Sequence, residues 1–134
     1  MDESPKDCFL QSLDRCRRNI EFIPKFYERF LSSSDEIRDK FKFTDFEKQN
    51  QMLLRSLKLA AGATSGDRES LREIRERAET HNRQHLNIEP ALYDLWLSCV
   101  IDVAREFDEQ WNESIEDAWN AILGYVIRHM IKYY

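Results

Sequence analysis

Apolar residues recur every three or four positions along most of the chain, which is the pattern of amphipathic helices. The residues between positions 19 and 31 carry an aromatic-rich apolar stripe, and Pro24 is either tolerated near the first turn of that helix or produces a kink. No strand-like alternation and no internal repeat interrupts the pattern. The predicted helices cover residues 5–17, 19–31, 36–41, 46–61, 70–82, 87–107 and 114–132. The pattern therefore predicts an all-α fold of about seven helices.

Helix boundaries are marked by capping and turn residues. The run Ser32–Asp35 predicts a stop followed by a new N-cap, and Thr44 or Asp45 can cap the next helix. Two of the three glycines lie in residues 62–67, which we expect to be a loop. Asn87, with Pro90 just beyond it, predicts the start of a further helix.

Composition and length agree with one helical domain spanning residues 1–134. Hydrophobic residues make up 42% and charged residues 34% of the chain, with only three glycines and three prolines. A chain of 134 residues can bury most of its apolar surface without help from disulfides or metals. An enclosed cofactor is therefore possible.

The charge distribution excludes two classes of partner. The net charge is -5, and no concentrated basic face is visible, so we expect neither nucleic acid nor an anionic membrane surface as a partner. The first eight residues lack the basic start and apolar core of a secretory signal. No stretch approaches the roughly 18 apolar residues of a membrane helix. We expect a cytoplasmic protein.

The three cysteines, Cys8, Cys16 and Cys99, form no metal-binding spacing. An odd number is a poor basis for a disulfide framework. If Cys8 and Cys16 share a helix, the rise of that helix separates them by roughly 12 Å, which is too far for a bridge. We expect all three to be reduced packing residues.

Two predicted helices carry a polar residue on their apolar face. Gln49 lies in register with Leu53 and Leu57, and His81 continues the stripe that contains Ile74 and Ala78. An inward histidine can donate a ring nitrogen to a metal, while its other nitrogen bonds an acceptor that fixes the tautomer. Spacing alone favours a core or interface histidine without a metal.

The chain resembles the bacterial single-domain globins related to Vitreoscilla haemoglobin and to the globin domains of flavohaemoglobins. Residues 26–31 (FYERFL), followed by 35–38 (DEIR) and Phe41, are similar to the family's second helix and the phenylalanine that packs on haem. Gln49 and Leu53 resemble the distal glutamine and the leucine beside it.

The likeness continues through the second half of the chain. Residues 78–83 (AETHNR) resemble the end of the helix that carries the proximal histidine. Residues 90–97 and 117–119 resemble the family's last two helices. Globin signatures are sparse, so the order and separation of these stretches carry the resemblance, which runs over nearly the full length.

The resemblance implies a haem pocket and its residues. His81 would hold the iron of haem b, and Tyr27 and Gln49 would face the bound gas on the distal side. A hydrogen bond from either side chain to a partly charged diatomic ligand is worth about 1 to 3 kcal/mol. The residues expected to contact the cofactor are Phe41, Leu53, Leu57, Ile74, Ala78, Ile88 and Tyr93.

Several alternatives stay open at these positions. Phe26 could face the iron in place of Tyr27, and Phe43 or Phe46 could replace Phe41. Gln49 could face solvent, since a shift of register would exchange it with a neighbour. A further histidine, His85, could be the haem ligand, or could grip a metal such as zinc together with His81 four residues before it. With no distal histidine matched, ferrous iron should be five-coordinate.

The sequence departs from the family pattern on the proximal side. In flavohaemoglobin-type globins a tyrosine and a glutamate support the proximal histidine. Tyr93 resembles the tyrosine, but no residue after Asp117 matches the glutamate. Tyr125 is an alternative supporting residue. A strong electronic push from the histidine is therefore not expected.

The resemblance implies reversible binding of O2, with NO or CO as other ligands. Conversion of NO to nitrate would need a separate reductase, because residues 1–134 have no room for a flavin and nicotinamide module. The alternatives are a haem-based gas or redox sensor that acts through a partner protein, and a haem-free interaction domain with the globin fold. A monomer and a homodimer both fit the sequence.

Overall fold

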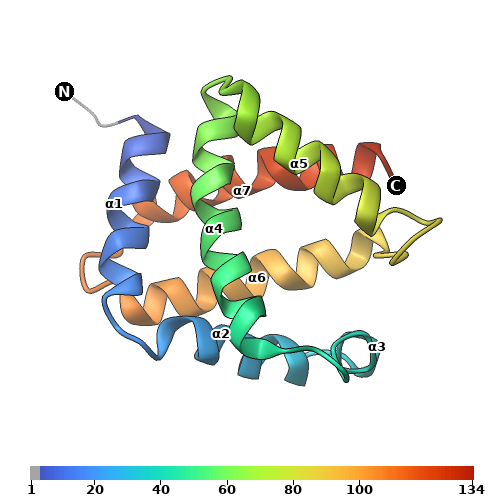
Figure 1. Cartoon of the computed structure of the whole chain (residues 1–134). Coiled ribbons are helices and arrows are strands. Elements are labelled where there is room, and N and C mark those ends of the chain that lie inside the picture. Colours follow the sequence, from blue (N-terminus) through green and yellow to red (C-terminus); the bar gives the residue numbers. More distant parts are fainter. Residues whose placement is uncertain (1–3) are drawn as a thin grey trace.

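The computed structural model describes residues 4–134, which form seven α-helices and no strand (Figure 1). The helices are α1 (Pro5–Arg17), α2 (Phe22–Ser32), α3 (Asp35–Lys40), α4 (Phe46–Thr64), α5 (Arg68–His81), α6 (Pro90–Phe107) and α7 (Glu113–Lys132). The prediction of an all-α fold with about seven helices is confirmed. The helix ends differ from the sequence-based prediction by three residues at three places, and by at most two residues elsewhere.

The first difference is at the start of α2, which begins at Phe22 instead of residue 19. Asn19 forms a turn with the residues after it: its side-chain Oδ1 accepts from the Glu21 amide at 2.9 Å, and its carbonyl accepts from the Phe22 amide at 3.1 Å. Pro24 becomes the third residue of the helix, where its missing N–H breaks no helical hydrogen bond.

The second difference is at the end of α4, which continues through Gly62 to Thr64. A Cβ atom added to Gly62 would lie 2.4 Å from the Ser70 Oγ atom on α5. The glycine is therefore required by the close approach of two helices, and it does not mark a loop. The turn itself contains Gly66, whose φ of +83° is in the left-handed region that favours glycine.

The third difference is at the start of α6. Pro90 is the first residue of the helix, and Glu89 caps it without a side-chain hydrogen bond. Asn87 does not begin the helix: it lies in the preceding loop with a φ of +52°. Asparagine tolerates this left-handed conformation better than most residues. Residues 82–89 thus form a loop directly after His81.

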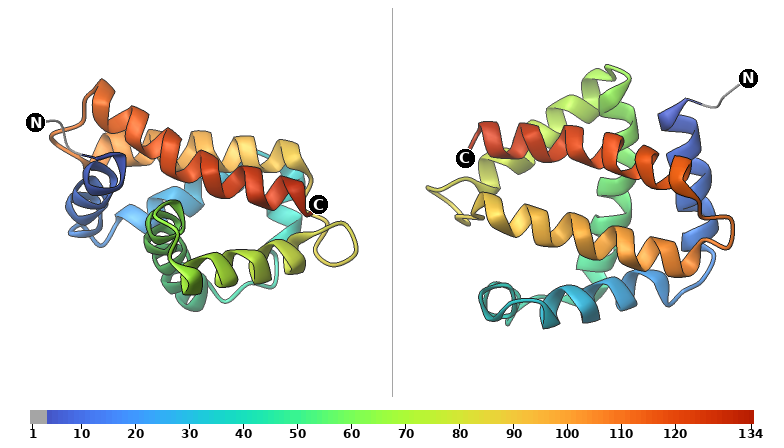
Figure 2. Two further views of the ribbon diagram at one scale, coloured as in Figure 1. Left: turned by 90° about the horizontal axis from the view of Figure 1, so that it is seen from above. Right: turned by 180° about the vertical axis from the view of Figure 1, so that it is seen from behind.

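The helices pack around one main apolar core with a smaller apolar cluster beside it. The long helices α6 and α7 run side by side in opposite directions, and α4 crosses them (Figure 2). Trp119 of α7 is fully buried, and its ring packs edge-on against Phe9 of α1 with centroids 4.7 Å apart. From the turn after α4, α5 diverges at an angle (Figure 1). Residues on both helices line a cavity.

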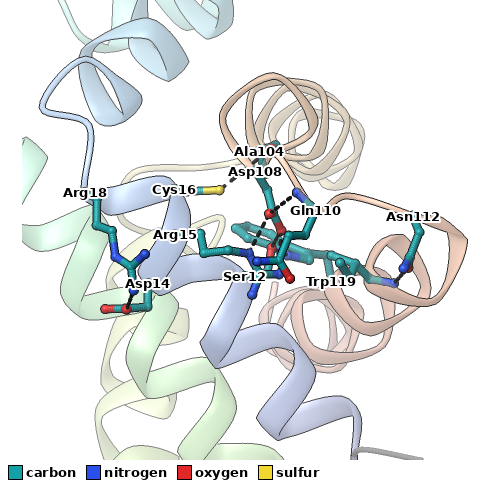
Figure 3. Close-up of polar contacts among 11 residues, drawn as sticks. Ser12, Asp14, Arg15, Cys16, Arg18, Ala104, Asp108, Gln110, Asn112 and Trp119 are labelled. Carbon is teal, nitrogen blue, oxygen red and sulfur yellow. Dashed lines mark hydrogen bonds and ion pairs between the residues drawn. The ribbon is translucent and has the colours of Figure 1, made fainter.

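A buried polar cluster joins α1 to the connection between α6 and α7 (Figure 3). Asp108 accepts from the Ser12 hydroxyl at 2.6 Å, from two nitrogens of Arg15 at 2.6 and 3.0 Å, and from the Gln110 amide at 2.9 Å. Ser12 in turn accepts from the indole nitrogen of Trp119 at 2.9 Å. Each buried polar group in this cluster has a partner, so the cluster fixes this corner of the fold.

Two further predictions concern cysteines and membranes. Cys16 and Cys99 are buried, and Cys8 packs partly buried against the core. The Cys16 Sγ lies 3.6 Å from the Ala104 carbonyl oxygen, as expected for a packing cysteine. Within residues 4–134, no helix is both long enough and apolar enough to span a bilayer.

Candidate functional site

A cavity of about 610 Å³ lies on the inner side of the angle between α4 and α5. It falls within the range of about 300 to 1,000 Å³ that is typical of cofactor sites. Its walls are mainly apolar and also include residues of α2, α3, α6 and α7. Met52 and Leu86 line it while remaining about half exposed, so the cavity opens to solvent beside them.

Most residues predicted for a haem site line this cavity. They are Tyr27, Phe41, Gln49, Leu53, Ile74, His81, Ile88 and Tyr93. The structure places Leu57 and Ala78 elsewhere, behind the wall, where they are 0% and 1% exposed. Leu57 belongs to the main core, and Ala78 packs in a smaller cluster with Tyr93 and Met130. Both support wall residues of the cavity and are not among those that line it.

His81 is the last residue of α5 and lies in the cavity wall with its ring fixed by its own helix. Its Nδ1 atom lies 2.7 Å from the Arg77 carbonyl oxygen and 3.1 Å from the Thr80 hydroxyl. A carbonyl oxygen only accepts, so Nδ1 carries the proton in this arrangement. The Nε2 atom, on the far side of the ring from this backbone, therefore keeps its lone pair.

Burial also favours the neutral form of His81. The cavity wall desolvates the imidazole and lowers its pKa below the ordinary value, and the nearby Arg77 charge acts in the same direction. The Arg77 carbonyl opposes this by accepting from the ring. A neutral imidazole with a fixed tautomer is the form that binds a metal.

Across the cavity from α5, Tyr27 of α2 and Gln49 of α4 supply polar groups. Tyr27 is 5% exposed, and its hydroxyl donates to the Gln49 carbonyl at 3.4 Å. Burial raises the pKa of Tyr27 to about 12, so the phenol keeps its proton. At 3.4 Å the hydrogen bond is long, and the hydroxyl can turn to another acceptor at small cost.

The comparisons with known proteins agree with this geometry. The family model for globins matches residues 24–131. The chain belongs to the globin family. A crystal structure of a Pseudomonas aeruginosa PAO1 protein that is structurally highly homologous to a human hemoglobin superimposes with a TM-score of 0.93 at 33% identity, over 98% of both chains. Among curated proteins, none matches the sequence.

These findings confirm the expected resemblance to a bacterial globin. Globins hold haem and bind small gases, so family membership implies a haem-based role in binding a small ligand. The structure of this globin fits haem in two respects. The cavity is apolar and of cofactor size, and its wall presents one imidazole with the tautomer fixed for metal binding.

The phenylalanines considered as alternatives to Tyr27 and Phe41 do not line the cavity of this globin. Phe26 is fully buried against Trp96, with ring centroids 6.2 Å apart, so Tyr27 and not Phe26 lines the cavity. Phe43 is 93% exposed. Phe46 packs against Tyr27 with centroids 5.5 Å apart, behind the residues that face the cavity.

The other candidate ligands lie outside the cavity lining. His85 is exposed in the loop after α5, where its Nδ1 lies 2.8 Å from the Asn82 Oδ1 atom, so it does not share a helix face with His81. Within residues 4–134, no group of three or more histidine, cysteine or acidic side chains is arranged to hold a metal.

Tyr125 packs on His129, with ring centroids 4.7 Å apart. Of the two tyrosines considered for the proximal side, Tyr93 alone lines the cavity.

Sequence reasoning missed five polar residues of the cavity wall: Lys40, Thr44, Ser56, Arg77 and Thr80. Arg77 lies one turn before His81 on the same helix, and its register relative to Ile74 and His81 was visible in the sequence. Arg77 was not predicted to line the cavity because a charged residue on a helix is usually assigned to the solvent face. The apolar wall contributed by α7 was also missed, since no motif marks it.

Proposed function

We propose that this globin binds haem b between α4 and α5, with His81 as the iron ligand, and that it reversibly binds O2 or another diatomic gas beside Tyr27 and Gln49. The observation that carries the proposal is the hydrogen bond from His81 Nδ1 to the Arg77 carbonyl at 2.7 Å, in an apolar cavity of about 610 Å³. Among the described residues 4–134, this bond leaves Nε2 as the one imidazole lone pair in the cavity wall.

His81 is supported as the ligand by its neutral form and by its rigid attachment. The loop after α5 returns to it, since the Ile88 amide donates to the His81 carbonyl at 2.9 Å. Haem iron, when bound, supplies the centre that takes up a diatomic gas. Since the acceptor for Nδ1 is a neutral carbonyl and not a carboxylate, His81 remains a moderate electron donor.

Tyr27 and Gln49 supply hydrogen-bond donors on the opposite side. Both side chains line the cavity, and the buried Tyr27 hydroxyl retains its proton. A donor at this place stabilises a ligand that acquires partial negative charge, by about 1 to 3 kcal/mol. This favours O2 with slow release, with NO and CO as other ligands. Oxidation of NO by O2 to nitrate takes up one electron, which a separate reductase would supply.

The experiment is absorption spectroscopy of the purified protein with haem, first ferric and then reduced with dithionite. We expect a strong Soret band and, on reduction, a five-coordinate high-spin spectrum that changes on exposure to CO. His81→Ala should lose or strongly alter this spectrum, because it removes the imidazole that would hold the iron.

Two matched histidine variants serve as controls. His85 is exposed in the loop and His129 packs on Tyr125, so His85→Ala and His129→Ala should keep the wild-type spectrum. Absence of a Soret band in wild-type protein after haem addition would contradict the proposal. A spectrum that survives His81→Ala and is lost in His85→Ala would move the iron ligand to the loop.

A further inference from the structure

Arg77 places a positive charge in the wall of an otherwise mainly apolar cavity. It lies on α5 one turn before His81, and its Nη1 atom donates to the Ser56 hydroxyl of α4. The side chain thus reaches from one helix of the cavity to the other. In the part of the chain that the structure describes, Ser56 is its hydrogen-bond partner and no carboxylate forms an ion pair with it.

Two neighbouring cations, Arg55 and Lys40, have a carboxylate or two carbonyl groups as partners. Arg55, one position before Ser56, pairs with Glu73 at 2.7 Å outside the cavity lining. Lys40 lines the cavity, but its ammonium donates to the carbonyls of Leu86 and Asn87 at 3.2 and 3.3 Å. A guanidinium has five N–H donors, so Arg77 retains donors beyond the one directed at Ser56.

A half-buried guanidinium without a counter-ion is unfavourable. The carboxylate of Glu73, one turn before Arg77 on α5, already pairs with Arg55 at 2.7 Å. Removal of the guanidinium from water costs free energy, which Arg77 would not lose at the protein surface. An anion bound beside the guanidinium in the cavity would offset this cost. A planar guanidinium matches the two oxygens of a carboxylate better than any other side chain does.

We propose that Arg77, with the Ser56 hydroxyl beside it, binds a carboxylate on the edge of the planar ligand, which for haem is a propionate group. The inference rests on the proposed function, since it names the contact that the haem edge makes. The proposal places the acidic edge of the ligand beside Arg77 of α5 and Ser56 of α4, whose side chains are in contact. The ligand class is thereby an apolar planar molecule with an acidic edge.

The experiment compares binding of haem with binding of haem dimethyl ester, in which both carboxylates are capped. Affinities come from the Soret band and from quenching of tryptophan fluorescence, since Trp96 lines the cavity. The measured quantity is the ratio of the affinity for haem to that for the ester. This ratio removes any steric cost of the methyl groups that is common to all variants.

We expect wild-type protein to prefer haem by roughly tenfold or more, the effect of one hydrogen-bonded charged group. Arg77→Leu should lower this preference by roughly tenfold, and Arg55→Leu, which removes the same charge outside the cavity, should keep it. Arg77→Lys keeps a charge without the paired donors, and should reduce the preference. It is the second variant if Arg77→Leu does not fold, as judged by circular dichroism.

Three results would overturn the inference. Equal binding of haem and ester by wild-type protein would show that no carboxylate is recognised. If Arg77→Leu changes neither the affinities nor their ratio, another residue recognises the carboxylate. If Arg77→Leu lowers the affinities for haem and for the ester equally, Arg77 only holds α4 and α5 together. Failure of the proposed function differs from all of these, because wild-type protein would then bind neither compound with a Soret band.

Discussion

The two ends of the helical bundle use buried polar groups in opposite ways. At the corner where α1 meets the α6–α7 connection, the Asp108 carboxylate is fully buried and accepts hydrogen bonds from Ser12, Arg15 and Gln110. In the cavity between α4 and α5, the polar groups of Tyr27 and Arg77 have few partners in the protein. Buried polar groups whose hydrogen bonds are all made stabilise the fold. Buried polar groups with unused hydrogen-bonding capacity reduce stability until a ligand binds them.

The largest effect should come from breaking the complete cluster. Asp108→Asn keeps the shape of the side chain but leaves the Arg15 guanidinium, with its side chain 15% exposed, without its counter-ion. Removal of one partner of a buried pair costs about 3 to 5 kcal/mol. Urea unfolding followed by circular dichroism measures the loss. The affinity of the folded variant for haem should be unchanged, because Asp108 lies outside the cavity lining; a large loss of haem affinity at equal helicity would contradict the comparison.

The same cluster should make stability depend on acidity. Burial raises the pKa of Asp108, but the hydrogen bonds from Arg15, Ser12 and Gln110 outweigh this and bring the pKa below the ordinary carboxyl value. A depressed folded-state pKa stabilises the fold above the unfolded value of about 3.9, and this contribution is lost as the pH falls through the folded value. The difference in unfolding free energy between wild type and Asp108→Asn should therefore shrink below about pH 4. A constant difference from pH 7 to pH 3 would show that the carboxylate charge contributes nothing.

In the cavity, substitution should change ligand release more than stability. Tyr27→Phe removes a hydroxyl whose protein contact is a long hydrogen bond of 3.4 Å. We expect O2 to leave the variant faster by a factor of roughly 5 to 150, which corresponds to about 1 to 3 kcal/mol. Stopped-flow displacement of O2 by CO measures the rate. The unfolding free energy should fall by less than in Asp108→Asn, and an unchanged release rate would leave Gln49 as the distal donor.

The smallest effect should arise where the cavity meets the loop after His81. The Tyr134 hydroxyl donates to the Asn87 Oδ1 atom at 2.5 Å, and its ring lies under the Arg83 guanidinium, 4.7 Å from the centroid. Tyr134→Phe keeps the ring contact and loses one exposed hydrogen bond, so global stability should fall by only about 0.5 to 1 kcal/mol. Faster amide exchange confined to residues 82–89 is the expected signature. Exchange equal to wild type would mean that the hydroxyl does not hold the loop.

The contrast between the two ends also explains what the sequence could predict. The stripe that places Ile74 and His81 on one face of α5 follows from helical periodicity, so the fold class and part of the cavity lining could be predicted. The wall contributed by α7 could not be predicted, because no motif marks it. The Ser12–Asp108 contact joins residues 96 positions apart, and no local pattern encodes it. The inward placement of Arg77 likewise depends on Ser56, which lies on another helix.

The misplaced helix ends have a similar cause. Gly62 is a turn-forming residue by local propensity, yet it lies inside α4 because only glycine permits the approach of Ser70 from α5. Asn87 is a plausible helix start by composition, yet it takes a left-handed conformation in a loop that Lys40 and Tyr134 contact from outside. Tertiary contacts overrode the local signal at both positions.

Hydrogen exchange with and without haem, followed by mass spectrometry, tests the central claim most directly. Binding should slow amide exchange in α4, α5 and residues 82–89, whose polar and apolar side chains line the cavity. Exchange at the α1 corner, around residues 108–112, should stay the same, because its polar groups already have their partners. Unchanged exchange in α4 and α5, or protection confined to the α1 corner, would contradict the assignment of the cavity as the haem site.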